Sequence, residues 1–465
     1  MAVFTLIIGG FLGVWLLISY LLNWNEMKYK KKGLPPGTMG WPLLGETTNF
    51  LKKGPSFMKN QRTRYGNVFK SHLLGCPTVV SMDPETNAYI LMNESKGFVP
   101  GYPQSMVDIL GKSNIGSVQG VDHKNIRGSY LHLMNPTIIK HKIIPQIDDF
   151  IRTYLSTWTN QVIDIQEKTE QMTHLLSLKQ FAGNESTPLS KELNTEFLKL
   201  VLGTFSLPIN LPCTNYRRGL HARKKIVKIV KQLIEDRRNS DKTHEDMLSL
   251  LMNGDENRYK LNDQEIIDQA ITIFYSRYET VSTTSMMAVK YLHDHPGVLE
   301  ELRKEHIEIR EKKKPQDPLD WDDYKSMRFT RAVILETSRL ATIVNGVLRK
   351  TTKEVELNGY IIPRGWKIYV YTREINYDPC LFPNPYTFNP SRWLQDETLE
   401  ARNYSFMFGG GTRLCPGKEL GIIEISTFLH YFVTNYRWEE IGEHKITKFP
   451  RVEAINGLHI RVSTR

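Results

Sequence analysis

The stretch that decides the fold is FGGGTRLCPG, residues 408–417, which stands directly before an apolar segment of helical pattern. Pro416 suits the first turn of a helix, so we predict a helix from Pro416 to about Phe432 with Cys415 at its N-terminus. The helix dipole and free N–H groups there favour a thiolate and lower the pKa of the thiol. The glycines allow a flat ligand to approach closely. These features fit a haem with Cys415 as its iron ligand, and Arg413 could pair with an anionic edge of that group.

A phosphate-binding loop is the alternative interpretation of this glycine-rich segment. Such a loop needs Gly-Lys followed by Ser or Thr after a strand. Here Lys418 is followed by Glu419, and irregular chain precedes the glycines. The remaining cysteines, Cys76, Cys213 and Cys380, form no CxxC pair and fit a reducing cytosolic compartment.

The loop matches the cysteine-loop motif of the cytochrome P-450 superfamily at five fixed positions. These are Phe408, Gly411, Arg413, Cys415 and Gly417. Two further segments, ETSR at 336–339 and FNPSRW at 388–393, resemble the family's Glu-x-x-Arg helix and the segment that supplies a second arginine. The resemblance implies a mainly α fold with a small β region, haem b as cofactor, O2 as co-substrate, and electrons from NADPH through a reductase.

The resemblance also implies residue roles. The expected partners of the haem propionates are His123, Arg127 and Arg349, with His123 where many members have Trp. The structural triad is expected to comprise Glu336, Arg339 and Arg392. A buried Glu between two Arg leaves no charge unpaired, so we expect this triad to lock the scaffold around the cysteine loop without taking part in the chemistry. The alternative to this buried triad is that Glu336 and Arg339 form an ion pair on the surface of a helix, three residues apart.

A helix of about 33 residues, against a mean near 11–12, is predicted from Asn262 to His295. Asn262 and Glu265 resemble a capping box, and Pro296 ends the pattern. The middle of the segment is apolar on most sides, which indicates a helix buried in the core of a large domain.

Glu279 and Thr280, midway along this helix, match the acid–alcohol pair with which oxygenases of the superfamily relay protons to oxygen. Arg277 stands where the family usually has Gly. We expect its side chain either to intrude on the oxygen and substrate pocket or to pair with Glu279. Either arrangement predicts impaired turnover in a normally folded haem protein.

Residues 1–24 are uncharged and mostly apolar, long enough for one membrane span of about 20 helical residues. Lysines at 28 and 30–32 follow, so the rest of the chain is predicted to face the cytosol. A cleaved signal peptide is the alternative. In such peptides the basic residues precede the apolar core, whereas here they follow it. Residues 25–45 form a basic, Pro- and Gly-rich hinge. Residues 46–465 are predicted to be the catalytic domain, on a membrane that the resemblance suggests is the endoplasmic reticulum.

The whole chain resembles plant brassinosteroid six-oxidases. The resembling segments are Leu34–Glu46, Phe69–Pro77, Met327–Thr352 and Phe408–Gly442. The implied reaction is hydroxylation at carbon six of a six-deoxo brassinosteroid and then ketone formation. Open alternatives are oxidation of another sterol or triterpenoid, a haem-thiolate isomerase or dehydratase, and a haem binder with little turnover. The net charge of +11 suits an acidic reductase or an anionic membrane, no nucleic-acid signature accompanies it, and we expect a monomer.

Overall fold

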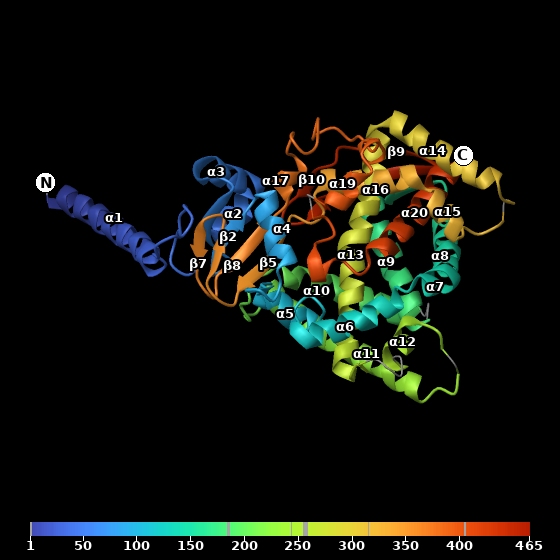
Figure 1. The fold of residues 1–465 in the computed structure, drawn as a ribbon, viewed down its shortest axis with the longest axis horizontal. Helices are drawn as coiled ribbons and strands as arrows, with labels where there is room; N and C mark the ends of the chain where they lie inside the picture. Colours follow the sequence, from blue (N-terminus) through green and yellow to red (C-terminus); the bar gives the residue numbers. More distant parts are fainter. Residues whose placement is uncertain (1, 184–186, 243, 254–258, 315, 404–405) are drawn as a thin grey trace. The chain divides into compact units, whose positions relative to one another are not determined.

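The computed structural model describes residues 2–183, 187–242, 244–253, 259–314, 316–403 and 406–465. The chain divides into two compact units, each built from separate segments. The first comprises Met1–Tyr102, Val344–Ile375 and Gly410–Thr412, and the second Pro103–Ile343, Asn376–Gly409 and Arg413–Arg465. Helices dominate and the sheets are small, so the expected fold class is confirmed (Figure 1).

The first unit is built on a five-stranded sheet of order β1-β2-β8-β5-β3. Its strands are β1 (Val68–Leu73), β2 (Cys76–Ser81), β3 (Phe98–Pro100), β5 (Gly346–Thr351) and β8 (Lys367–Tyr371), with β6 (Val355–Leu357) and β7 (Tyr360–Ile362) as a separate hairpin. Its helices are α1 (Ala2–Lys28), α2 (Thr47–Lys53), α3 (Pro55–Tyr65), α4 (Pro84–Met92) and α17 (Arg373–Asn376). Strand β2 runs parallel to β8, with Thr78 opposite Lys367, and the other pairs are antiparallel. Asn358 and Gly359 both have positive φ, as a two-residue hairpin turn requires.

The second unit is mainly helical. Its helices are α5 (Gln104–Leu110), α6 (Gly120–Leu133), α7 (Pro136–Ile138), α8 (Ile144–Ser156), α9 (Ile165–Ala182), α10 (Thr187–Thr204), α11 (Asn215–Arg238), α12 (Met247–Asn253), α13 (Asp263–Asp294), α14 (Pro296–Glu311), α15 (Trp321–Ser326), α16 (Arg328–Ala341), α18 (Arg392–Gln395), α19 (Thr398–Arg402) and α20 (Lys418–Asn435). Its strands are β4 (Gln161–Asp164), β9 (Tyr436–Glu440) and β12 (His459–Thr464) in one sheet, and β10 (Ile446–Lys448) and β11 (Val452–Ala454) in a hairpin.

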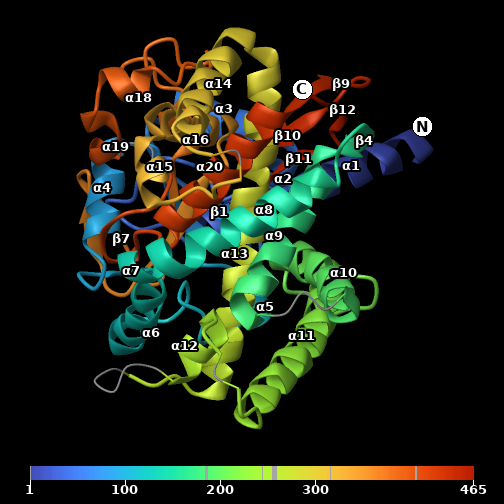
Figure 2. The same ribbon diagram turned by 90° about the vertical axis from the view of Figure 1, so that its right-hand side faces the viewer.

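Helix α13 forms the centre of the second unit and packs against α9, α16 and α20 (Figures 1 and 2). Its predicted capping box is confirmed: Asn262 Oδ1 accepts from the Glu265 backbone N–H at 3.0 Å, and Glu265 Oε2 accepts from the Asn262 N–H at 2.8 Å. The helix ends before Pro296, as predicted, because proline lacks the N–H that would continue the ladder.

Helix α20 begins two residues later than predicted. The sequence indicated Pro416 as its first residue, whereas the helix starts at Lys418 with Gly417 at the N-cap. The Cys415 N–H donates to the Phe408 carbonyl at 2.8 Å, which closes the loop on itself and delays the first helical turn. Cys415 therefore lies just outside the helix.

Helix α1 covers the segment for which a membrane span was expected. Within the described residues, the structure contains no helix of the length and apolar character that crossing a membrane requires.

Candidate functional site

The cysteine loop is held in one conformation by close backbone contacts. Gly411 has φ +63°, and a Cβ at this position would lie 2.4 Å from the Leu91 carbonyl oxygen, so only glycine fits. Asn403 Nδ2 donates to the Gly409 carbonyl at 2.8 Å. Within the second unit, this bond and the bond from Cys415 to Phe408 fix the position of the sulfur.

Cys415 is exposed to solvent, although protein atoms crowd around its thiol. Burial raises the pKa of the Cys415 thiol, while the Gly417 N–H and the charges of Arg127 and Lys418 act in the opposite direction. The expected lowering of this pKa is therefore wrong for the protein alone, because desolvation outweighs the nearby positive groups. A metal cation bonded to the sulfur would favour the thiolate.

Arg413 ties the cysteine loop to the segment before α6. Its Nη1 donates to the Ile115 and Gly116 carbonyls at 3.0 and 3.4 Å, and its Nη2 donates to the Val118 carbonyl at 2.5 Å. Backbone carbonyls thus occupy several of its donors, so its pairing with an anionic edge of haem stays a prediction.

The three expected propionate partners lie on two elements, α6 in the second unit and β5 in the first. His123, which is buried, and Arg127, which is half-buried, lie one turn apart on α6. Arg349, on β5 of the first unit, is 2% exposed, and its Nε has no hydrogen-bond partner among the described residues. No acidic side chain in the described parts of the chain forms an ion pair with Arg127 or Arg349. A buried guanidinium without an acid favours an anionic ligand, and the carboxylates of haem fit that need.

Glu336, Arg339 and Arg392 come together in the core of the second unit. Glu336 Oε1 accepts from Arg339 Nη2 at 2.9 Å and from Arg392 Nε at 3.1 Å, and Oε2 accepts from Arg339 Nε at 2.9 Å. The side chains of Glu336 and Arg339 are fully buried, which excludes the surface-pair alternative. The sequence interpretation missed two further donors, the Trp393 indole N–H and the Asn389 backbone N–H, although both lie in the quoted FNPSRW segment.

Glu279 and Thr280 contact different partners. Thr280 Oγ1 donates to the Ser276 carbonyl at 2.7 Å, and Ser276 is exposed although the residues before and after it on α13 are buried. Glu279 Oε1 accepts from Arg451 Nη1 at 3.4 Å. Burial raises the pKa of the Glu279 carboxyl, and Arg451 opposes that shift. The acid is thus biased towards holding a proton, as a relay requires.

The expectation that Arg277 pairs with Glu279 is wrong. Arg277 is buried, and its Nη2 lies 3.0 Å from Glu424 Oε1 on α20, as an ion pair not aligned as a hydrogen bond. Its Nη1 donates to Ser177 Oγ on α9 at 3.4 Å. Successive helical residues point about 100° apart, so Arg277 can leave the face that carries Ser276 and Thr280. Two helices that pack against α13, α9 and α20, supply these partners.

Replacing Arg277 with Gly is expected to destabilise the fold while leaving turnover per loaded haem unchanged. The change leaves Glu424, 2% exposed, without its cation, at a cost of about 3–5 kcal/mol in unfolding free energy. Burial already raises the pKa of Glu424, so the loss should shrink at low pH, where this carboxyl takes up a proton.

Chemical denaturation at several pH values, with Glu424→Gln and the double variant, measures this effect. The double variant should recover part of the loss. Lower turnover in the parent chain than in Arg277→Gly would instead support the impairment that the sequence suggested.

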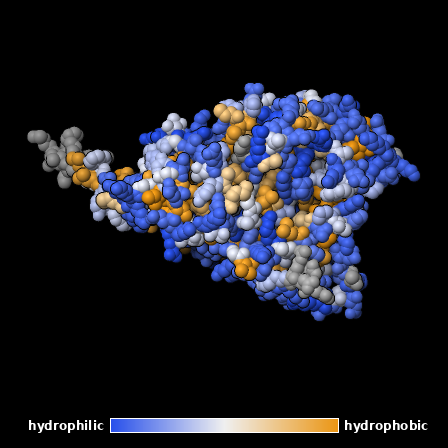
Figure 3. Space-filling view, in the orientation of Figure 1, coloured by the Kyte–Doolittle hydropathy of each residue, from blue (hydrophilic) through white to orange (hydrophobic). Residues whose placement is uncertain are grey.

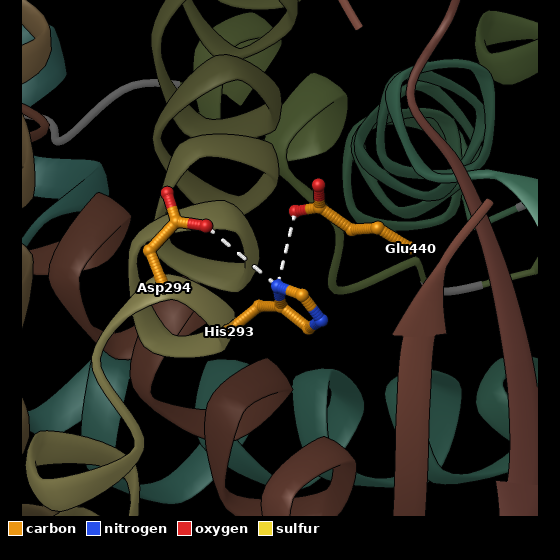
Figure 4. A group of neighbouring side chains, drawn as sticks. All are labelled: His293, Asp294 and Glu440. Atoms are coloured by element: carbon orange, nitrogen blue, oxygen red, sulfur yellow. Dashed lines mark ion pairs between the residues drawn. The ribbon is translucent and has the colours of Figure 1, made fainter. Parts of the chain in front are cut away.

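A second group of potential metal ligands lies at the C-terminal end of α13. His293 Nδ1 is 3.6 Å from Asp294 Oδ1 and 3.5 Å from Glu440 Oε1 (Figure 4). Lys290 Nζ contacts the same two carboxylates at 2.6 and 3.1 Å. Because this ammonium already pairs with both acids, the group is an ion-pair network that joins α13 to β9.

Comparisons with known proteins agree with this geometry. The family model described as Cytochrome P450 matches residues 35–456. The chain is 67% identical over 463 residues to Cytochrome P450 85A1 of Solanum lycopersicum and 61% identical over 464 residues to Cytochrome P450 85A2 of Arabidopsis thaliana, with each pair covered over its full length. The solved structure of retinoic acid bound cyanobacterial CYP120A1 superposes with a TM-score of 0.85 at 25% identity, covering 93% of this chain and 99% of that one. The chain therefore belongs to the cytochrome P450 family, the haem-thiolate monooxygenases that use O2 and electrons from a reductase partner.

Proposed function

We propose that this chain oxidises carbon six of six-deoxo brassinosteroids, first to the alcohol and then to the ketone, as in the conversion of six-deoxocastasterone to castasterone. The observation that carries the proposal is the full-length likeness to cytochromes P450 85A at up to 67% identity. A likeness of 37% over 439 residues to a 3beta,22alpha-dihydroxysteroid 3-dehydrogenase of Arabidopsis thaliana supports a steroid substrate.

Some side chains of the chain are proposed to bind the cofactor, and others are proposed to supply protons. Haem bound through sulfur supplies the activation of O2, because the thiolate pushes electron density to the iron and favours O–O cleavage. Cys415 provides that sulfur from its fixed loop, and Arg127 and Arg349 are proposed to bind the propionates. Glu279 is proposed to hold a proton, which passes through the Thr280 hydroxyl to oxygen.

We further propose that α1 anchors the chain to the endoplasmic reticulum as a single span, with the catalytic domain facing the cytosol. Several large side chains of α1 are mostly exposed, among them Leu12, Trp15 and Tyr20 at 53%, 62% and 63%. Figure 3 shows orange, hydrophobic residues among the described residues of this helix. Apolar groups left exposed in this way favour a lipid environment. The lysines at 30–32 follow at the proposed cytosolic end.

Residues 46–465 are proposed to act as one catalytic domain, because each compact unit uses segments from distant parts of the chain. The basic excess of the chain suits an NADPH–haemoprotein reductase with an acidic docking surface. We propose a monomer that receives electrons from this reductase.

The proposal predicts that microsomes containing the chain and a reductase convert six-deoxo brassinosteroids into products heavier by one oxygen and then into the six-ketones. Mass spectrometry of products from a panel of six-deoxo steroids, other sterols and triterpenoids measures this. Conversion that needs NADPH and reductase excludes an isomerase or dehydratase. Product from the other sterols or triterpenoids alone contradicts the assigned substrate, and a spectral response without product indicates a haem binder.

A further inference from the structure

The partly buried guanidinium of Arg451 contacts three carboxylates, one of which is that of Glu279. Arg451 Nη1 lies 3.4 Å from Glu279 Oε1, and its Nη2 lies 3.6 Å from Glu170 Oε1. Its Nε lies 3.5 Å from Glu453 Oε2. The side chains of Arg451 and Glu279 are each 15% exposed, that of Glu170 is 21% exposed, and that of Glu453 is 43% exposed. The cluster thus extends from the acid of the acid–alcohol pair to a carboxylate in contact with water.

The four groups come from three elements of the second unit. Glu170 lies on α9 and Glu279 on α13, two helices that pack against each other. Arg451 precedes β11, which carries Glu453. Tyr278, next to Glu279 on α13, also lies near Glu170 and opposes the rise of its pKa. Of the described side chains, those that act electrostatically on Glu170 are therefore a tyrosine, two glutamates and one arginine.

Three carboxylates share a single positive charge here, and two of them, Glu170 and Glu279, have little access to water. Like charges that close together disfavour full ionisation, so the cluster retains a proton near neutral pH. Burial raises the pKa of Glu170 to about 7. Burial alone would lower the pKa of Arg451, but the carboxylates, Glu279 foremost, raise it above its ordinary value. The proton that can be exchanged is therefore bound to one of the carboxylates, while the guanidinium of Arg451 stays protonated.

We propose that Glu170, held by Arg451, stores the proton that recharges Glu279 during turnover. The proposal rests on the proton-transfer role proposed above for Glu279. In the step, the O–H bond of the Glu170 carboxyl breaks and an O–H bond forms on the Glu279 carboxylate, directly or through one water. The Glu170 carboxylate left behind is stabilised by Arg451 and takes a new proton from solvent at its accessible edge. No electron moves in this step.

The test compares Glu170→Gln, Glu170→Asp and the unaltered full-length chain, each loaded with haem and reconstituted with reductase in lipid vesicles. Glu167→Gln is the matched control, because Glu167 lies one turn earlier on α9 and is exposed. Product per NADPH and release of hydrogen peroxide are followed across neutral pH. The unaltered chain should lose coupling as the pH rises through about 7, where Glu170 ionises.

Glu170→Gln should form product about tenfold more slowly, less than the loss of 100-fold or more expected for an acid that acts directly. It should also release more peroxide and show no pH dependence near neutrality. Glu170→Asp, which keeps a titrating group, should retain that dependence, and Glu167→Gln should behave like the unaltered chain. Equal coupling and equal pH profiles for Glu170→Gln and Glu167→Gln would overturn the proposal.

A stability measurement separates this proposal from the assignment of the substrate. Folded Glu170 holds its proton up to about pH 7, whereas an unfolded glutamate loses it near its ordinary pKa of about 4.3. The folded chain binds more protons in that window, so the unfolding midpoint should fall as the pH rises through it. Glu170→Gln should remove this slope and Glu167→Gln should not.

If no steroid yields product with any chain, the assigned function fails. The proposal that Glu170 stores a proton is still tested by how the unfolding midpoint changes with pH. The pH dependence of NADPH-driven peroxide release also tests it. If Glu170→Gln does not load haem, Glu170→Asp tests the proposal instead. Because aspartate also titrates, loss of all pH dependence in that variant would contradict a proton stored at this position.

Discussion

Replacing Cys415 with Ala is expected to abolish the thiolate spectrum of the reduced, carbon monoxide-bound protein and to reduce steroid oxidation to background. Alanine provides no iron ligand, and the red-shifted Soret band depends on sulfur bonded to iron. The change should disturb the fold little, because the loop is closed by backbone contacts and by the glycine at 411, not by the thiol.

The measurements are the carbon monoxide difference spectrum, haem content and product formation in the same preparations. Cys380→Ala is the control, since Cys380 is an exposed cysteine outside the loop. It should keep both the spectrum and the activity. A Cys415→Ala protein that retains the thiolate band would mean that another sulfur binds the iron, and the assignment of the site would fail.

Replacing Glu336 with Gln is expected to lower the unfolding free energy by about 3–5 kcal/mol, because Arg339 and Arg392 then remain buried without a counter-charge. The amide also presents N–H groups where the carboxylate accepted hydrogen bonds from Trp393 and Asn389, so some donors lose their acceptor. Since α16 and the Arg392 segment meet at this carboxylate, weaker haem retention should accompany the loss.

Glu397→Gln provides the comparison for this prediction. Glu397 also pairs with an arginine, Arg328, but the two side chains are 72% and 67% exposed. Exposed ion pairs contribute about 0–1 kcal/mol to the free energy of unfolding, so the stability of this variant should differ little from that of the parent. Denaturant unfolding followed by circular dichroism, together with the rate of haem loss, measures both variants. Similar small losses in the two would show that the triad does not hold the scaffold.

Local signals in the sequence gave the bounds of α13 accurately. The capping box fixed its first turn, and the proline fixed its end. Short strands without strong alternation, such as β3 and β10, escaped prediction, because two or three residues carry too little pattern and form only where a neighbour supplies hydrogen bonds.

The sequence by itself determined the chemistry at the sulfur: a cysteine after glycines, before a helix, in a motif that fits one ligand. The resemblance of two segments to motifs of the family also identified Glu336, Arg339 and Arg392, which the structure brings together. Only the tertiary structure decided the partners of charges inside α13. Arg277 pairs with Glu424 on α20, and Glu279 pairs with Arg451 beside β11. Helical spacing gives the relative directions of side chains along one helix, but the partner that each meets depends on which distant elements pack against that face.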